Sequence, residues 1–390
     1  MRYVTRFLEK DLLKAARHFP AIILTGPRRA GKATLLRHLF PKAAHVLLED
    51  PDITSRVRSD PNGFLDELSP PVILDEIQNV PELFNYIRSR IDLKGKARGA
   101  WLLTGSQEAP LMKRVTESMA GRAAVFQLLP LSVRESPKVS LVQGGFPEVI
   151  QSPSVAEVWL RSYVQTYLER DVRAVSSIRD LGTFRRFLAL LASRCGQMLN
   201  KTEFAAPLGV SVPTITQWLS ILEITGQIIL VPPFYENFGK RIVKSPKVYF
   251  VDSGVLCHLL GVTSEKSLRE SVFHGPVFEG FVAAEIVKQQ VHSGHAKALY
   301  CFRDQQGLEV DFVVPVGTGK FALIEAKASR TPTPDMAGPI TRLARGMSKY
   351  TTHGYVVHQP SGTKTELGAL KPGVKAIGIG SLHEVLGRSK

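Results

Sequence analysis

Residues 26–33 have the spacing of a phosphate-binding loop. An apolar run over 21–24 is followed by two glycines, a lysine and a segment of helix-forming residues. In such a loop, backbone N–H groups and the helix start bind phosphates, while the lysine reaches the β and γ oxygens. The candidate nucleotide-binding residues are Gly26, Pro27, Arg28, Arg29, Ala30, Gly31, Lys32, Ala33 and Thr34.

One position of this loop departs from the usual pattern. The motif G-x-x-x-x-G-K-[ST] places a hydroxyl after the lysine to bind Mg²⁺, and this chain has Ala33 there. Water could replace that hydroxyl, or Thr34 could supply one if the helix start shifted. Arg28 and Arg29 either contact phosphates or face water. The sequence therefore predicts ATP and Mg²⁺ as cofactors, with weak hydrolysis.

Two carboxylates follow a second buried strand. Residues 71–74 are Pro-Val-Ile-Leu and lead directly into Asp75 and Glu76, which is the arrangement of a Walker B motif. There the first acid orders the magnesium shell and the second polarises the attacking water. The candidate catalytic residues here are thus Lys32, Asp75 and Glu76. A further apolar run over 100–103 ends in small polar residues, among which Ser106 is a candidate sensor of the γ-phosphate.

These motifs resemble the AAA-type P-loop ATPases of bacteria and archaea. The matching segments are 26–32, 73–78, 103–107, 119–122, 129–132 and 144–148. The similar subgroup carries a carboxyl-terminal domain of unknown function that is related to PD-(D/E)XK nucleases, and the resemblance runs from about residue 4 to about residue 330. It implies a homo-oligomer and makes Arg122 a candidate sensor or arginine finger, since such sites often take an arginine from the next subunit. The alternative is a solvated helix-end arginine.

The last third of the chain carries a second chemical pattern. Residues 309–314 and 321–327 have strand character, and Glu325 and Lys327 share a strand face because they are two positions apart. The pattern resembles a PD-(D/E)XK nuclease site. This resemblance implies that Asp311 and Glu325 bind one or two Mg²⁺, that Glu279 completes the shell and that Lys327 orients the water. Glu285 is a second candidate for the helix position, and the alternative to cleavage is a fold retained for nucleic-acid or subunit binding.

Residues 200–222 have the outline of a helix-turn-helix. A short helix breaks at Gly209, Ser211 caps a second helix, and strand-like segments over 227–232 and 247–251 would form a wing. The candidate DNA-binding residues are Thr214, Thr216, Gln217, Lys240 and Arg241, with Lys244 and Lys247 as basic neighbours. The alternative is a structural or protein-contact module.

The composition and charge of the chain indicate what kind of partner it binds and in which cellular compartment it works. The 390 residues are 44% hydrophobic and 22% charged, with a formal net charge of +15, which favours polyanions such as DNA. The amino terminus lacks the apolar middle of a secretory signal, and no apolar run is long enough to span a membrane. Three widely separated cysteines favour a reduced compartment. We therefore expect a soluble, cytoplasmic protein.

The expected fold is α/β and its domains follow the motifs. We expect an AAA-type P-loop NTPase domain with a parallel sheet over 1–150, a helical connector over 151–196, a winged helix-turn-helix over 197–256 and an α/β PD-(D/E)XK nuclease-like domain over 257–390. A turn is expected at Pro51 and Asp52 and a surface turn over 292–295.

Two functions fit these expectations. The first is an ATP hydrolase that acts on DNA, with metal-dependent DNA cleavage as an additional activity. The second is a non-catalytic, nucleotide-gated regulatory protein that grips DNA or a protein partner.

Overall fold

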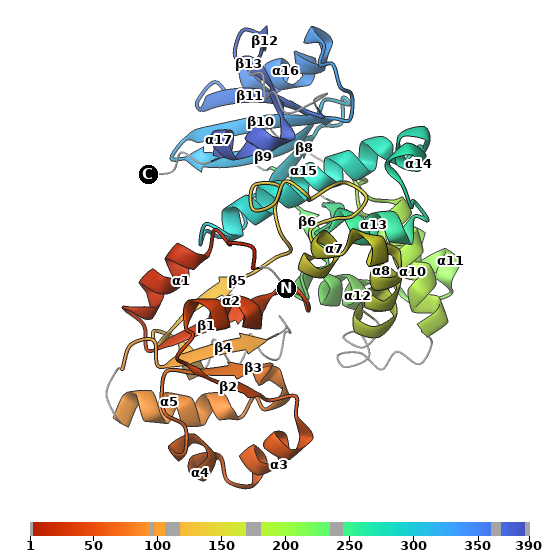
Figure 1. Cartoon of the computed structure of the whole chain (residues 1–390). Coiled ribbons are helices and arrows are strands. Elements are labelled where there is room, and N and C mark those ends of the chain that lie inside the picture. The colour runs from red at the N-terminus through yellow and green to blue at the C-terminus, as the bar shows by residue number, and fades with distance from the viewer. Residues whose placement is uncertain are drawn as a thin grey trace. The chain divides into compact units, whose positions relative to one another are not determined.

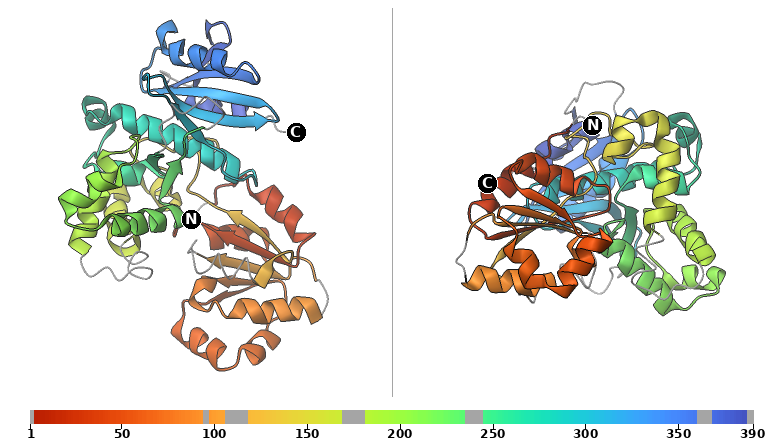
Figure 2. Two further views of the ribbon diagram at one scale, coloured as in Figure 1. Left: turned by 180° about the vertical axis from the view of Figure 1, so that it is seen from behind. Right: turned by 60° about the horizontal axis from the view of Figure 1, so that its bottom comes forward.

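A computed structural model describes residues 3–93, 97–105, 118–168, 181–234, 245–359 and 368–386. The chain forms two compact units. The first comprises residues 1–130, 224–226 and 291–295, and the second comprises residues 131–223, 227–290 and 296–390. Ribbon views of the whole chain are given in Figures 1 and 2.

The first unit is built on a parallel sheet. Its strands in the described residues are β1 (Ala21–Thr25), β2 (Ala44–Leu47), β3 (Val72–Asp75), β4 (Trp101–Gly105) and β5 (Ala123–Gln127). They lie in the order β2-β3-β4-β1-β5, and every neighbouring pair is parallel (Figure 1). The predicted parallel sheet is therefore confirmed, and the three strands predicted to be buried, β1, β3 and β4, are buried. The carboxyl ends of its strands share one edge.

Helices cover both faces of this sheet (Figures 1 and 2). Helices α1 (Glu9–Ala16) and α2 (Lys32–Leu39) pack on one face, and α3 (Pro51–Ser59), α4 (Pro61–Asp66) and α5 (Leu83–Leu93) on the other. Each face of the sheet has its own hydrophobic core, because successive side chains of a strand point to opposite faces. In β1, Ile22 and Leu24 pack in the first core, with α1 and α2, while Ala21 and Ile23 pack in the second core, with α3, α4 and α5.

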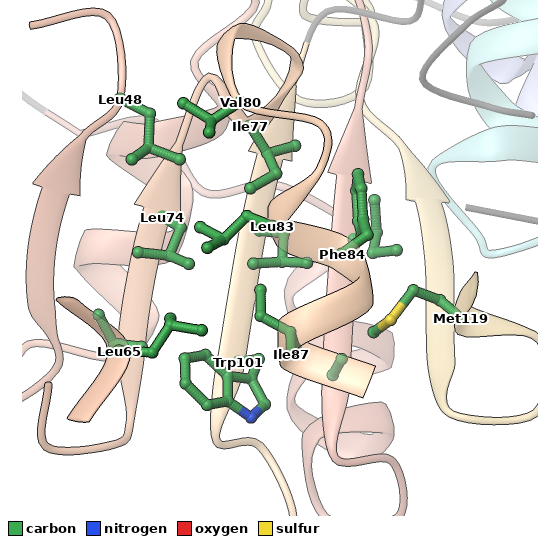
Figure 3. Close-up of a cluster of buried hydrophobic side chains, with 14 of the residues drawn as sticks. Leu48, Leu65, Leu74, Ile77, Val80, Leu83, Phe84, Ile87, Trp101 and Met119 are labelled. Atoms are coloured by element: carbon green, nitrogen blue, oxygen red, sulfur yellow. The ribbon is translucent and has the colours of Figure 1, made fainter. Parts of the chain in front are cut away.

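The second of these cores is drawn in Figure 3. It places side chains of β3 and β4, such as Leu74 and Trp101, against Leu83, Phe84 and Ile87 of α5. These side chains are 5% exposed or less, and burying each stabilises the fold by roughly 1.5–3 kcal/mol. This packing fixes the positions of the carboxyl ends of β3 and β4, and the candidate acids lie at the end of β3.

The segment after β2 differs from the expected turn. Pro51 is the first residue of α3, and the side chain of Asp50 caps that helix by accepting hydrogen bonds from the N–H groups of Asp52 and Ile53. Proline suits this position because its missing N–H would have no intrahelical partner there. The Asp-Pro pair therefore begins a helix instead of closing a turn.

The expected surface turn over 292–295 is also corrected in part. His292 is 1% exposed and its Nε2 accepts a hydrogen bond of 3.1 Å from the Leu129 N–H, whereas His295 is exposed. The imidazole satisfies a buried backbone donor, which is a structural role within the first unit.

The second unit begins with a helical part. Its elements are α7 (Pro147–Gln151), η2 (Pro153–Val155), α8 (Ala156–Tyr163), η3 (Val164–Leu168), α10 (Leu181–Ser193), α11 (Lys201–Leu208), α12 (Val212–Ile224), the antiparallel pair β6 (Ile228–Val231) and β7 (Lys247–Phe250), then α13 (Ser253–Leu259), α14 (Glu265–Glu270) and α15 (His274–Val291). Helix α11 is followed by Gly209, whose φ of 65° lies in the left-handed region that glycine tolerates. Ser211 then accepts a hydrogen bond from the Thr214 N–H at the start of α12.

A six-stranded mixed sheet completes the second unit. Its strands are β8 (Tyr300–Arg303), β9 (Glu309–Gly317), β10 (Lys320–Lys327), β11 (Thr351–His358), β12 (Gly368–Lys371) and β13 (Val374–Gly378), and its helices are η4 (Pro334–Ala337), α16 (Gly338–Gly346), η5 (Ile379–Ser381) and α17 (Leu382–Leu386). The order is β12-β13-β11-β10-β9-β8, with β9 antiparallel and β11 parallel to β10. Helix α16 buries Ile340 and Leu343 against this sheet.

No described helix combines the length and apolarity that crossing a membrane requires.

Candidate functional site

The phosphate-binding loop connects β1 to α2. Gly26 has a φ of 142°, and a Cβ atom at this position would lie 2.1 Å from the carbonyl oxygen of Leu128. Gly31 has a φ of 94° and precedes the first residue of α2. Both glycines are therefore required by the backbone, one by close approach and the other by its left-handed conformation.

Lys32 is the first residue of α2 and is 5% exposed. Its Nζ donates hydrogen bonds of 3.0 Å to the carbonyl oxygens of Gly26 and Pro27. The ammonium group is thus held inside the loop, at the positive end of the helix dipole, where both attract phosphate oxygens.

The two residues after Lys32 differ in exposure. Ala33 is half-buried and Thr34 is exposed on α2. Successive helix residues point about 100° apart, so Thr34 does not take the direction of the position that follows the lysine. In this helix start, the hydroxyl missing at Ala33 is not supplied by Thr34.

The two acids lie at the carboxyl end of β3. Asp75 is the last residue of the strand and is buried, and Glu76 adopts a left-handed conformation with a φ of 59°. The hydroxyl of Thr104, on the neighbouring strand β4, donates to Asp75 Oδ1 and accepts from the Glu76 N–H at 3.3 Å. Thr104 therefore fixes the positions of both acids.

The loop and the acid pair meet at this edge of the sheet. Arg28 NH1 lies 3.7 Å from Glu76 Oε2 and 3.9 Å from Glu49 Oε1, and Gln78 donates a hydrogen bond to Glu76. His45 of β2 places its Nε2 3.4 Å from Asp75 Oδ2. Thus Arg28 contacts the second acid of its own chain, while Arg29, with a φ of 63°, is exposed.

Sequence reasoning missed His45 and did not single out Thr104. The signal for Thr104 was present, because it is the next-to-last residue of β4, the strand that neighbours β3 in the sheet. His45 carried no such signal, since its contact depends on the parallel pairing of β2 with β3. Ser106, the candidate γ-phosphate sensor, lies outside the described residues.

Arg122 lies at the opposite end of the strands from the loop and the two acids. Its carbonyl oxygen accepts a hydrogen bond from the N–H of Ala21, the first residue of β1, so it borders the amino ends of the sheet. Its guanidinium pairs with both carboxylate oxygens of Asp92, at 2.7 and 2.9 Å. Arg122 therefore does not reach the nucleotide site of its own chain, and its action on a neighbouring subunit stays a prediction.

Helix α12 carries three of the candidate DNA contacts. Thr216 and Gln217 are exposed, and Thr214 is partly buried. The hydroxyls of both threonines already take part in local hydrogen bonds, Thr214 with Ser211 and Thr216 with the Val212 carbonyl. Lys240, Arg241 and Lys244 lie outside the described residues.

A cluster of charged side chains lies between β7, α15 and the C-terminal sheet, all within the second unit. We call it the Lys247 cluster; its members are Lys247, Glu279, Glu309, Asp311, Glu325 and Lys327. The predicted nuclease-like residues Glu279, Asp311, Glu325 and Lys327 are thus brought together. Lys247 was expected to be a basic neighbour of the wing, but its side chain is 3% exposed and faces the acids.

The ammonium group of Lys247 is surrounded by carboxylates. Its Nζ lies 2.6 Å from Glu309 Oε1, 2.9 Å from Glu279 Oε1 and 3.6 Å from Asp311 Oδ1. Burial alone would lower the pKa of Lys247, but Glu279, Asp311 and Glu309 together raise it well above its usual value. Lys247 is therefore firmly protonated.

The remaining contacts of the cluster hold its acids in place. Asp311 Oδ2 accepts from the Ala326 N–H at 3.0 Å, and Lys327 Nζ lies 2.8 Å from Glu325 Oε2. Burial and the nearby Asp311 raise the pKa of Glu279 to about 7 and that of Glu325 to about 8. Among the described residues, Glu325 Oε1 is buried without a hydrogen-bond partner.

The alternative helix residue Glu285 belongs elsewhere in the second unit. Its Oε2 accepts from the Val133 N–H at 2.9 Å and its Oε1 lies 3.0 Å from Lys288 Nζ. Between the two candidates, Glu279 is the residue that joins the cluster.

The arrangement does not fit the predicted metal site. In the described ranges, no group of three or more His, Cys, Asp and Glu side chains is positioned to hold a metal ion. Two of the three predicted ligands, Glu279 and Asp311, face the ammonium group of Lys247 instead. Metal ions prefer such oxygens, but a protonated amine between them competes for the same lone pairs.

Three family profiles match the chain in succession. Residues 18–136 match an AAA domain, residues 134–266 a domain of unknown function (DUF8612) and residues 274–376 another (DUF4143). The first match contains the loop, both acids and Thr104, which together define an AAA-type P-loop ATPase domain.

Two relatives and one solved structure complete the comparison. Uncharacterized proteins of Mycobacterium bovis and Mycobacterium tuberculosis are each 31% identical over 330 residues, covering 83% of this chain and 73% of theirs. The chain therefore belongs to the family of these mycobacterial proteins. A Walker-type ATPase of Pyrococcus abyssi aligns with 65% of this chain and 94% of its own at 16% identity, with a TM-score of 0.41, too low to support a conclusion.

Proposed function

We propose that this chain binds ATP at residues 26–33 and hydrolyses it slowly. The observation that carries the proposal is the meeting of loop and acids at one sheet edge, where Arg28 of the loop lies 3.7 Å from Glu76. Lys32 would bind the β and γ phosphates, Asp75 would order the magnesium shell, and Glu76 would position the attacking water.

The residues at this edge fit Mg²⁺ in part. Asp75 and Thr104 offer a carboxylate and a hydroxyl, the oxygen ligands that Mg²⁺ prefers. When bound with ATP, the ion would neutralise charge on the phosphates. The chain's own contribution is incomplete at Ala33, whose side chain has no oxygen to offer.

Ala33→Thr is expected to raise the rate of Mg²⁺-dependent ATP turnover about tenfold, which corresponds to about 1.4 kcal/mol of transition-state stabilisation. The added hydroxyl follows Lys32 directly and would bind the ion from the half-buried side of the helix start. Steady-state phosphate release by the purified full chain measures this rate.

Thr34→Ala is the matched control, because its side chain is exposed and should leave turnover unchanged. Equal rates for wild type and Ala33→Thr would show that the missing hydroxyl does not limit hydrolysis.

A nucleotide-gated regulatory protein is the second candidate function, and Ala33 is the observation that favours it. In this case ATP occupancy sets the arrangement of the two units without turnover. Tight ATP binding by a wild-type chain that releases no phosphate would support this candidate over the first.

DNA is the partner we propose for α11 and α12. The support is the net charge of +15 together with the exposed side chains of Thr216 and Gln217 on the second helix. DNA cleavage is not part of the proposal, because Lys247 faces the acids that would have to bind the metal.

Affinity for duplex DNA is expected to fall about tenfold or more between 50 and 200 mM salt, because binding by a basic protein releases counterions. Fluorescence anisotropy with a labelled duplex measures the slope. Gln217→Ala should weaken DNA binding. The control Arg98→Ala, at an exposed position of the first unit, should leave the affinity for DNA unchanged. Affinity that is independent of salt would exclude this mode of binding.

A further inference from the structure

Arg28 lies within the phosphate-binding loop, and its side chain is only 9% exposed. Its NH1 atom lies 3.7 Å from Glu76 Oε2 and 3.9 Å from Glu49 Oε1, and all three residues belong to the first unit. A guanidinium stays charged at any physiological pH, so a buried one needs acids or a bound anion beside it. The loop therefore holds a cation that can pair either with these acids or with a phosphate.

The carboxylate of Glu76 is held in place beside Arg28. Its Oε2 atom, which lies near Arg28, also accepts a hydrogen bond from Gln78. The backbone of Glu76 has a φ of 59°, a conformation that residues other than glycine keep only where their surroundings hold them. An oxygen with these two partners has little capacity left to orient a water molecule. Glu76 is therefore freer to position water once Arg28 has moved away from it.

A phosphate is a stronger partner for Arg28 than the two acids are. Arginine binds phosphate through two parallel, charge-assisted hydrogen bonds, and a terminal phosphate carries more negative charge than one carboxylate. The ion pairs of Arg28 with Glu76 and Glu49, at 3.7 and 3.9 Å, are longer than such bonds. A phosphate beside Arg28 would therefore displace the acids from it.

The role of Glu76 indicates which phosphate this would be. Glu76 is assigned to the water that attacks the γ-phosphorus, so a side chain beside Glu76 lies beside the terminal phosphate of ATP. Lys32 reaches the β and γ oxygens from the start of α2. Because ADP has no γ-phosphate, it would leave Arg28 with its acids.

We propose that Arg28 binds the γ-phosphate of ATP, and that this phosphate takes Arg28 away from Glu76 and so frees the acid to position water. This inference rests on the proposed ATP site and deepens it. Arg28 is then the residue that distinguishes ATP from ADP, and its exchange of partners couples the binding of ATP to its hydrolysis.

Calorimetric titration of the purified full chain with Mg²⁺ tests the proposal. The two probes are ADP and a non-hydrolysable ATP analogue with an imido group between the β and γ phosphorus atoms. Arg28→Gln is expected to weaken binding of the analogue about tenfold and binding of ADP less than about twofold. Arg37→Gln is the matched control, because Arg37 is an exposed arginine of α2 outside the loop and should leave both affinities unchanged.

A double-mutant cycle tests the exchange between Arg28 and Glu76. Glu76→Gln is expected to bind the analogue about fivefold more tightly than wild type, because Arg28 no longer has to leave a carboxylate. The same substitution made in the Arg28→Gln chain should strengthen binding less than about twofold, since no ion pair is left to break. Affinity for ADP should be the same in wild type and Glu76→Gln.

Three results would overturn the proposal. Equal weakening of the analogue and ADP by Arg28→Gln would show that Arg28 only supports the loop, and unchanged affinities for both would show that it does not contact the γ-phosphate; in either case the proposed ATP site stands. A wild-type chain that binds neither nucleotide would overturn the proposed function and this inference with it.

Circular dichroism verifies that each variant is folded. If Arg28→Gln does not fold, Arg28→Lys replaces it, because lysine keeps the charge but loses the paired donors, and it should weaken only the analogue, by about threefold. Glu76→Gln also decides the matter by itself, since analogue binding no tighter than that of wild type would contradict the exchange.

Discussion

Lys32→Ala is expected to weaken ATP binding about 50-fold, which corresponds to about 2.3 kcal/mol and lies within the range for hydrogen bonds to charged groups. Lys32 is 5% exposed and its ammonium group is held at the loop by the Gly26 and Pro27 carbonyls. Its attraction for phosphate oxygens is therefore screened little by water. Titration with a fluorescent ATP analogue measures the affinity.

Lys42→Ala is the matched control for this prediction. Lys42 lies in the same unit but is exposed and outside the loop, so its removal should change affinity by less than about twofold. Equal affinities of wild type and Lys32→Ala would contradict the assignment of residues 26–33 as the nucleotide site. Circular dichroism of the variant verifies that the fold is retained.

Lys247→Ala is expected to destabilise the second unit by about 3–5 kcal/mol, the usual cost of leaving buried charges without their partner. Three carboxylates depend on this one ammonium group, at distances of 2.6, 2.9 and 3.6 Å. Its removal also breaks the ion pairs that join β7 to α15 and β9. The shift of the urea unfolding transition, followed by circular dichroism, measures the loss.

Lys297→Ala provides a matched comparison in the same unit. Lys297 pairs with Glu223 at 3.1 Å, but its side chain is 36% exposed, and surface pairs contribute only about 0–1 kcal/mol. If Lys247→Ala shifted the transition no more than Lys297→Ala, Lys247 would not hold the cluster together.

The predictable part of the first unit follows from short-range rules. Gly26, Gly31 and Lys32 lie close together in the sequence, within residues 26–32, so their spacing alone specifies the loop and its chemistry. Asp75 could be placed because a buried apolar run directly precedes it. The turn expected at Pro51 was wrong for a local reason, since Asp-Pro is equally suited to capping a helix and only the following residues decide.

The unpredicted features depend on contacts distant in sequence. Lys247 was assigned to the wing because basic residues surround it in the sequence. Its partners Glu279, Glu309 and Asp311 are 32 or more positions away, and only the fold brings them next to it. His45 and His292 were missed or misplaced for the same reason. Long polar side chains give no sequence signal of burial, because their usual place is the surface.

Mg²⁺-dependent ATP turnover by wild type and Glu76→Gln, measured side by side, tests the central claim most directly. Glu76 is held beside Arg28 and Thr104 and is assigned to position the attacking water. We expect slow wild-type turnover that falls at least about 100-fold in the variant, within the range for loss of a positioned proton acceptor, with ATP binding retained.

Glu67→Gln, a change to an exposed surface acid that pairs with Arg56, should turn over ATP at the wild-type rate. Turnover by Glu76→Gln equal to that of wild type would contradict the assignment of the acid pair. A wild-type chain that neither binds nor hydrolyses ATP would contradict the proposed function as a whole.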